Sequence, residues 1–282
     1  MRTASVSYAP TMATATRLHL IEPGHRVDLS LLDPADTSAA PGDKEATKAA
    51  TAPLVERLAE LQEILWARNG ERVLVVLQGI DTSGKGGTVE HVFGAVNPAG
   101  LKVESFKAPS ESELARDYLW RVHAHVPEDG EIGVFDRSHY EDVLAARVLG
   151  IVPEERWRPR FAHINAFEQM LSDEGTTIVK LLLHISKEEQ KRRLEARLAR
   201  PEKHWKFRIS DLDARAKWDD YQAAFAEAVE HTATEHAPWH VIPADKKWYR
   251  DWAVATIMVG VLEAMDLTWP EPEDDLSGIV IE

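Results

Sequence analysis

The chain has 282 residues, of which 44% are hydrophobic and 28% are charged, and it contains no cysteine. This length suits one large or two small domains, and the lack of Cys excludes disulfides, thiolate metal sites and thiol nucleophiles. The net charge of −14 argues against nucleic-acid or anionic-membrane binding, because both need a cationic face. No apolar run approaches the roughly 18 residues of a membrane span, and Met1–Ser5 lacks the apolar core of a secretory signal. We therefore expect a soluble, cytoplasmic protein.

The two ends of the chain differ in composition from the body between them. Residues 1–43 are rich in Ala, Thr and Pro without a sustained period, which predicts a loosely ordered arm. A short piece such as Leu18–Ile21 is the part of this arm that we expect to dock on the body. Residues 266–282 carry acidic residues and no Lys or Arg, which predicts a solvated acidic tail. Residues 44–265 form the predicted domain.

Within residues 44–265, short apolar runs alternate with helical periodicities. Leu residues at helical spacing from Leu54 to Leu65 predict a helix that ends at Gly70. The run Val73–Gln78 is apolar throughout, as a strand buried on both faces should be. Four further strands are predicted at Val103–Phe106, Ile132–Phe135, Ile178–Ile185 and Trp239–Ile242. The intervening helices are predicted from Ser110 to just before Pro127, around Val143, at 154–171, from Lys187 to about His231 with a break at Pro201, and at 248–265.

Five strands alternating with helices predict an α/β fold of three layers, with a five-stranded parallel sheet covered on both faces. The two long helices at residues 54–66 and 248–265 have apolar faces that either cover the sheet or supply an interface between subunits. Sheet coverage is the interpretation that we favour for most of these faces.

The segment Gly79–Thr88 follows the first predicted strand directly and matches the spacing G-x-x-x-x-G-K of a phosphate loop. Glycines allow backbone N–H groups to converge on phosphate oxygens at a helix N-terminus. Lys85 would place its positive charge on the phosphoryl group being transferred. A glycine-rich turn with a surface lysine is the alternative, and the strand-to-helix context argues against it. The loop residues expected to bind phosphate are Gly84, Gly86, Gly87 and Thr88.

One position departs from the usual phosphate loop. Gly86 stands where a Ser or Thr normally binds magnesium, and Thr88 lies too far along to replace that hydroxyl directly. Asp81, inside the loop, offers a hard oxygen ligand instead, and magnesium favours carboxylates together with water and phosphate. We therefore predict that Asp81 takes the role of the missing hydroxyl.

A second acidic residue ends the strand that begins at Ile132. Asp136 at a strand end is the usual partner of a phosphate loop for holding magnesium, and Arg137 follows it at the edge where open α/β sheets bind ligands. Ser138 and Glu141 have the spacing of a capping box, so we interpret Glu141 as a helix cap more readily than as a functional group. Contact with a nucleotide is the alternative for Glu141.

The segment from Lys187 to Arg215 is basic within an acidic chain, with ten Lys or Arg against six Asp or Glu. Its arginines at 193, 197 and 200 share one helix face, with Leu194 and Leu198 expected to pack beneath. A solvated charged helix is the alternative to a mobile lid that closes over a polyanion and excludes water. The position after the fourth strand and the local charge favour the lid. The lid residues expected to bind phosphate are Arg193, Arg197, Lys203, Lys206 and Arg208.

Several motifs in this order resemble those of the family-2 polyphosphate kinases, over roughly residues 40 to 265. The resemblance implies a P-loop kinase-like fold with a helical basic lid. The Phe135–Asp142 form is similar to that of the branch accepting both nucleoside mono- and diphosphates. The motifs that carry the resemblance are Gly79–Thr88 with the strand before it, Phe135–Asp142, Lys203–Phe207, Glu235–Trp239 and Ile242–Asp245.

The resemblance also implies an activity and roles for single residues. The family transfers a terminal phosphoryl group reversibly between inorganic polyphosphate and nucleotides such as AMP, ADP and ATP, with magnesium or manganese, and commonly forms dimers or tetramers. Asp81 and Asp136 match its metal-handling carboxylates, and Lys85 and Arg137 match cations of the reaction centre. Arg197 and Lys206 match lid positions that face the phosphates in the family. Lys107 and Arg121 lie in the region that binds the acceptor nucleotide.

A nucleotide phosphate oxygen is already anionic, so this transfer needs no general base. It needs cations that suppress the repulsion between two polyanions and hold them in line. An ATP-dependent nucleoside monophosphate kinase is the nearest alternative, because it shares the loop, the acidic strand end and a lid. A nucleotide-binding switch without turnover and a nucleic-acid-dependent NTPase are further alternatives, the last disfavoured by the acidity of the chain.

Overall fold

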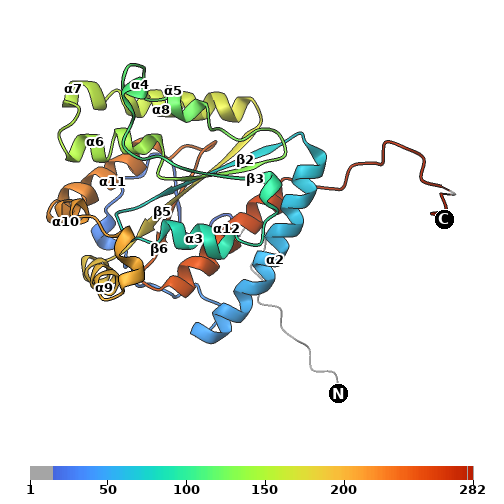
Figure 1. Cartoon of the computed structure of the whole chain (residues 1–282), viewed down its shortest axis with the longest axis horizontal. Coiled ribbons are helices and arrows are strands. Elements are labelled where there is room, and N and C mark those ends of the chain that lie inside the picture. Colours follow the sequence, from blue (N-terminus) through green and yellow to red (C-terminus); the bar gives the residue numbers. More distant parts are fainter. Residues whose placement is uncertain (1–14, 278, 282) are drawn as a thin grey trace.

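The computed structural model describes residues 15–277 and 279–281. In this part of the chain, a six-stranded sheet lies between two layers of helices (Figure 1). The strand order is β1-β6-β5-β2-β4-β3, and the pairs from β6 to β3 are all parallel. The strands are β1 (Leu20–Ile21), β2 (Arg72–Gln78), β3 (Leu101–Ser105), β4 (Ile132–Asp136), β5 (Thr176–His184) and β6 (Trp239–Pro243).

The five predicted strands are present, but the prediction was short by one strand. Leu20 and Ile21 pair antiparallel with His240 and Trp239, so β1 forms an edge strand beside β6. This pairing satisfies backbone groups that an open edge would leave without partners. Residues 27 and 29 are also buried in the core. The arm is therefore packed on the body from about residue 15, contrary to the expectation of loose order, and residues 1–14 lie outside the described residues.

One face of the sheet is covered by α2 (Lys44–Arg68), α3 (Lys85–Val92) and α12 (Lys247–Ala264), as Figure 1 shows. The α2 helix begins after the Asp43 cap and ends at Arg68, two residues before the predicted stop at Gly70, because Asn69 adopts the left-handed conformation. Most residues of α12 are buried against α2, α3 and the sheet. Coverage of the sheet is thus confirmed as the role of these apolar faces.

The other face is covered mainly by short helices, which lie at the top and left of Figure 1. The single helix predicted after Ser110 is two helices with a turn between them, although its capping box with Glu113 is present. The helix predicted at 154–171 is also two, because Pro159 caps the second one. The helices are α4 (Glu111–Leu114), α5 (Trp120–His123), α6 (Ala145–Val148), α7 (Glu154–Trp157), α8 (Arg160–Asp173) and α11 (Trp218–Thr232).

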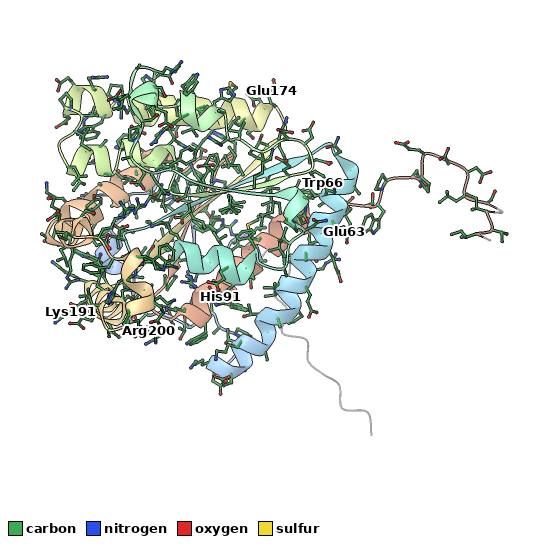
Figure 2. The ribbon with its side chains drawn as sticks, in the orientation of Figure 1. Glu63, Trp66, His91, Glu174, Lys191 and Arg200 are labelled. Atoms are coloured by element: carbon green, nitrogen blue, oxygen red, sulfur yellow. The ribbon has the colours of Figure 1, made fainter. Side chains whose placement is uncertain are left out.

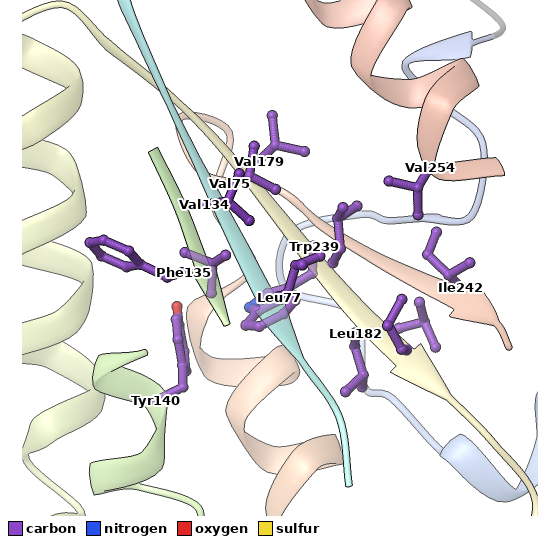
Figure 3. Packing of buried hydrophobic residues seen from close by; sticks show 14 of the residues in the cluster. Val75, Leu77, Val134, Phe135, Tyr140, Val179, Leu182, Trp239, Ile242 and Val254 are labelled. Atoms are coloured by element: carbon purple, nitrogen blue, oxygen red, sulfur yellow. The ribbon is translucent and has the colours of Figure 1, made fainter. Parts of the chain in front are cut away.

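The core lies on both sides of the central strands (Figure 3). Residues 73 to 77 of β2 are fully buried, as expected for a parallel strand between two helical layers. Val134 and Phe135 of β4 and Leu182 of β5 continue this core. The buried strands hold the loops at their carboxyl ends in fixed positions.

The chain leaves the body after α12 and contains no helix or strand in the described residues from 266 onward (Figure 1). Leu267 still packs against the core, whereas the acidic positions from 271 to 275 are exposed. No described helix combines the length and apolar character that crossing a membrane requires.

Candidate active site

Two loops meet at the carboxyl edge of the sheet because β2 and β4 are neighbours. Leu77 near the end of β2 pairs with Asp136 at the end of β4. The loop 79–84 that follows β2 and the segment 137–142 that follows β4 therefore lie side by side. Ligands of open α/β sheets bind at such an edge.

The phosphate loop, residues 79–84, has a backbone that only certain residues tolerate. Its φ angles are 146° at Gly79, 70° at Thr82 and 111° at Gly84, and α3 begins at Lys85. A Cβ on Gly79 would lie 2.7 Å from the carbonyl oxygen of Leu183. The loop thus turns sharply from β2 into the N-terminus of α3, where backbone N–H groups are available to an anion.

Lys85 is the charge around which the site is built. Its side chain is buried, and Nζ donates to the carbonyl oxygen of Gly79 at 2.7 Å. Burial lowers the pKa of Lys85, and the nearby Arg137 lowers it further, whereas Asp136, Asp81 and Glu141 act in the opposite direction. Five of the residues selected from the sequence therefore lie within electrostatic range of one another.

Arg137 and Asp81 join the two loops directly through an ion pair. Arg137 has a φ of 66°, and its backbone N–H donates to the carbonyl oxygen of Leu77 at 3.1 Å. A left-handed conformation at a non-glycine residue is rare and is frequent at functional sites. It turns the chain at the end of β4 so that the guanidinium reaches across to the phosphate loop.

The predicted cap role of Glu141 is wrong. Ser138 caps a short 3-10 turn, η3 (His139–Asp142), by accepting from the Tyr140 N–H, and no reciprocal bond from Glu141 is formed. With the Gln78 amide oriented to satisfy both of its ends, its nitrogen donates to Glu141 Oε1 at 3.1 Å. Burial raises the pKa of Glu141, although Arg137 and Lys85 oppose the shift. The carboxyl group faces the cations of the site instead of the helix end.

Two predicted phosphate ligands have side chains that bond the protein backbone. Thr88 is fully buried, and its hydroxyl donates to the Gly84 carbonyl at 3.2 Å, within the first turn of α3. Arg193 is 7% exposed, and Nη1 donates to the carbonyl oxygens of Thr82 and Ser83 at 2.9 and 2.7 Å. Its Nε bonds Glu189 and its Nη2 bonds the backbone at residues 244 and 245. Arg193 therefore holds the phosphate loop from behind.

The carboxylates predicted to hold a metal fit a site shared with a bound phosphate. Asp81 and Asp136 both lie within electrostatic range of Lys85, and a Cβ added at Gly86 would meet nothing within 4 Å. The space of the missing hydroxyl is thus open. Among the described residues, no group of three His, Asp or Glu side chains could hold a metal by itself. Two carboxylates completed by phosphate and water oxygens form a typical magnesium environment.

The basic segment forms α9 (Lys187–Leu198), the 3-10 turn η4 (Pro201–Lys206) and α10 (Ser210–Ala216). Figure 2 shows Lys191 and Arg200 on its outer side. Leu194 is buried as predicted, but Leu198 is 52% exposed. Arg197 lies 3.5 Å from Asp211, a buried carboxylate that the sequence interpretation did not select.

The remaining lid cations are farther from the reaction centre. Lys206 stacks on the ring of Trp205 with Nζ 4.8 Å from the ring centroid, and the backbone of Arg208 donates to Asp211. No hydrogen bond joins the side chains of Lys203, Lys206 or Arg208 to the phosphate loop in the described part of the chain. Phosphate binding by these three residues stays a prediction.

The expected acceptor region lies around the segment that follows β3. Arg121 is buried and donates through Nη1 to the carbonyl oxygen of Lys107 at 2.8 Å, whereas the Lys107 side chain is exposed. Arg121 also acts electrostatically on Asp142, the neighbour of Glu141 in the chain, and the Asp142 carboxylate accepts a hydrogen bond from Arg160 at 3.0 Å. This link connects the predicted nucleotide residues to the reaction centre.

A buried polar network behind this site was missed from the sequence. Lys180 Nζ donates to Glu168 Oε2 at 2.6 Å and to the Tyr140 hydroxyl at 2.9 Å, and all three residues are fully buried. The lysine in the middle of the apolar run 178–185 was the available signal. Because Tyr140 lies in η3, the network anchors the segment that carries Arg137 and Glu141. Arg250 of α12, which contacts the phosphate loop, was also missed.

Comparison with known proteins decides the family. The family model described as polyphosphate kinase 2 (PPK2) matches residues 42–270. The chain belongs to the polyphosphate kinase 2 family. The resemblance stated from the motifs is thereby confirmed.

Several named members of the family resemble the chain over most of its length. An AMP/ADP-polyphosphate phosphotransferase from Meiothermus ruber is 54% identical over 262 residues, covering 93% of this chain and 98% of that protein. An ADP-polyphosphate phosphotransferase from Rhodopseudomonas palustris is 41% identical over 229 residues, covering 77% of this chain and 79% of that protein. The crystal structure of polyphosphate kinase 2 from Arthrobacter aurescens matches with a TM-score of 0.90 and 46% identity, over 97% of this chain and 96% of that one. The P-loop kinase-like fold is therefore confirmed.

Proposed function

We propose that the chain transfers the terminal phosphoryl group reversibly between inorganic polyphosphate and nucleotides, converting AMP to ADP and ADP to ATP. The observation that carries the proposal is the convergence of Lys85, Arg137, Asp81 and Asp136 at the phosphate loop. The names of the two relatives described above support polyphosphate as donor and AMP and ADP as acceptors.

The charges at the site suit a transfer between two polyanions. The attacking group is a phosphate oxygen that already carries negative charge, so no side chain has to remove a proton. Lys85 and Arg137 reduce the repulsion between donor and acceptor and stabilise the negative charge on the phosphoryl group in the transition state. The burial of Lys85 strengthens its effect, because charges interact more strongly where water is excluded.

Magnesium is the metal that we propose for this site, with manganese as a substitute. Asp81 and Asp136 would hold it, and the ion would supply positive charge to the phosphate oxygens. The ion pair between Asp81 and Arg137 keeps this carboxylate at the reaction centre when no metal is bound.

Asp81→Asn tests the metal proposal because it keeps the shape of the side chain and removes its charge. We expect kcat to fall about 100-fold at 1 mM magnesium, with the magnesium concentration for half-maximal rate shifted upward. Titration of the initial rate with magnesium measures both effects. The control is Asp129→Asn, on the opposite edge of the sheet. An unchanged magnesium dependence in the Asp81 variant would contradict the assignment.

Donor and acceptor are proposed to approach from different sides. Polyphosphate would lie along the phosphate loop and the basic lid, and the nucleotide near Lys107 and Arg121. This arrangement places the two reacting oxygens on opposite sides of the transferred phosphorus.

The direct test is incubation with ADP, magnesium and long-chain polyphosphate in the absence of ATP, with ATP formation as the readout. A second reaction with AMP in place of ADP decides the range of acceptors. Formation of ATP supports the proposal. Absence of product from polyphosphate, together with turnover of AMP plus ATP, would instead identify an ATP-dependent nucleoside monophosphate kinase.

Three properties outside the site complete the proposal. The enzyme would act in the cytoplasm, would form a dimer or tetramer, and would not bind nucleic acids or membranes, in line with the net charge of −14. Light scattering during size-exclusion chromatography measures the oligomeric state. Stimulation of turnover by single-stranded DNA would contradict the exclusion of nucleic acids.

A further inference from the structure

Two buried arginines from different helices meet at Gly84 of the phosphate loop. Arg193 of α9 is 7% exposed and Arg250 of α12 is 1% exposed. A Cβ on Gly84 would overlap the Arg250 guanidinium and would lie 3.6 Å from Arg193 Nη1. Both guanidinium groups therefore lie near the side of Gly84 that a Cβ would occupy.

The two arginines act on different parts of the loop backbone. The Arg193 guanidinium does not reach into the open site, because its N–H groups donate to Glu189 and to backbone carbonyl oxygens, including those of Thr82 and Ser83. Arg250 covers the first turn of α3, where a Cβ on Gly87 would lie 3.3 Å from its Nη2. Holding the carbonyl groups on one side leaves the loop N–H groups free for an anion on the other.

Each arginine of the pair has a carboxylate partner, Glu189 for Arg193 and Asp251 for Arg250. Nε and Nη2 of Arg250 donate to Asp251 Oδ1 at 2.8 and 2.5 Å, which leaves Nη1 as the guanidinium nitrogen next to Gly84. Burial lowers the pKa of Arg193; Glu189 opposes this, and the charge of Arg250 adds to the lowering. Two like charges at one glycine favour the arrival of a polyanion at the loop.

We propose that Arg193 and Arg250 are positioning residues that hold the phosphate loop in its anion-binding conformation and bias it toward the polyphosphate donor. The inference rests on the proposed function for the identity of the donor. It gives α12 a role at the site in addition to covering the sheet.

The primary test is Arg250→Met, which keeps a long side chain and removes the charge and the N–H donors of the guanidinium group. We expect the KM for polyphosphate to rise about tenfold, the KM for ADP to change less than twofold, and Tm to fall by only a few degrees. Arg57→Met on α2 is the matched control, because it makes the same change at an exposed arginine that also contacts α12. A rise below threefold in the polyphosphate KM, or equal rises in both KM values, would overturn the proposal.

A second measurement tests whether Arg250 acts through the loop glycines. Gly87 has no positive φ, so alanine fits its backbone and only the approach of Arg250 opposes it. We expect Gly87→Ala to raise the polyphosphate KM in the wild-type background and to have at most half of that effect, in free-energy terms, in the Arg250→Met background. If the effects of Gly87→Ala and Arg250→Met on the polyphosphate KM were additive in free energy, the contact between Arg250 and Gly87 would have no influence on polyphosphate binding.

Binding of tripolyphosphate measured by calorimetry separates this inference from the catalytic proposal. Weaker binding to Arg250→Met than to wild type supports the positioning role even if the wild type fails to form ATP, an outcome that would overturn the proposed function alone. Equal tripolyphosphate affinity in the two proteins overturns the positioning role alone. If Arg250→Met does not fold, Arg250→Lys carries the same comparison, because lysine keeps the charge but cannot contact both glycines.

Discussion

The phosphate loop and the basic lid both present cations to the same polyanions, but they hold them in opposite ways. Lys85, Arg193 and Arg250 are nearly inaccessible, and their donors are fixed on backbone or carboxylate oxygens. Lys206 and Arg208 of the lid are exposed, with side chains that make no hydrogen bond to the loop. The loop carries the greater desolvation cost, and in return its charges are preorganised and little affected by salt.

The difference predicts which kinetic constant each region controls. A fixed buried charge that meets the phosphoryl group directly, as proposed for Lys85, can contact it more closely in the transition state than in the ground state, and so affects kcat. Arg193 and Arg250 act on the loop backbone instead and are expected to affect the KM for polyphosphate. Exposed charges attract a flexible polyanion through a field that salt screens, and so affect KM.

The largest effect is expected from Lys85→Met. Removing the central charge of the loop should lower kcat about 1000-fold, in the range measured for loss of one preorganised donor to a transition-state oxygen. Because burial already lowers the pKa of Lys85, loss of its charge should not lower Tm. Steady-state kinetics and thermal unfolding measure both quantities, with Lys48→Met on α2 as the control. A rise in the KM for polyphosphate with kcat unchanged would show that Lys85 only attracts the substrate, as the lid cations are expected to do.

A smaller effect is expected from the double variant Lys203→Ala/Lys206→Ala. The KM for polyphosphate should rise about five- to tenfold at 20 mM salt, where screening is weak, and approach the wild-type value at 500 mM salt. The KM for ADP at saturating polyphosphate should change little. The matched control is Lys191→Ala, which removes one charge from the outer side of α9 (Figure 2). A loss that is the same at both salt concentrations would remove these lysines from the polyphosphate path.

The smallest effect is expected from Glu141→Gln, and it concerns stability. Burial raises the pKa of Glu141 above its ordinary value of 4.5, so its stabilising contribution is present below that pH and is lost as pH rises through the folded pKa. Glutamine avoids this loss while it keeps an acceptor for Gln78.

We therefore expect Glu141→Gln to have a Tm about 2 °C above wild type at pH 7.5, and an equal Tm at pH 4. Thermal unfolding at several pH values measures the difference. A variant less stable than wild type at pH 7.5 would show that the carboxylate is needed to balance Lys85 and Arg137, as the lid carboxylate Asp211 balances Arg197.

Much of the reaction centre was predictable because its residues follow directly from strand ends. The apolar run of β2 fixes where the phosphate loop starts, and the run of β4 fixes where Asp136 and Arg137 emerge. Parallel strands bring such loops to one edge, and the pairing of β2 with β4 in the structure then places Asp81 beside Arg137.

Other assignments failed because a local pattern had two solutions. The spacing of Ser138 and Glu141 satisfies a capping box, but the 3-10 turn at 139–142 leaves the carboxylate facing Arg137 and Lys85. Arg193 lies on a helix face with Arg197, yet one side chain bonds the loop backbone and the other bonds Asp211. Helical periodicity gives the direction of a side chain and not the element that it meets.

By itself the sequence determined where the five parallel strands lie along the chain, the place of the phosphate loop and the charge of the lid, because these depend on neighbours a few positions away. Only the tertiary structure decided that β1 closes the sheet edge, that Lys180 is compensated by Glu168, and that α12 brings Arg250 to Gly84. Each of these joins residues separated by long stretches of chain, and burial of charge is settled by whichever partner the packing supplies.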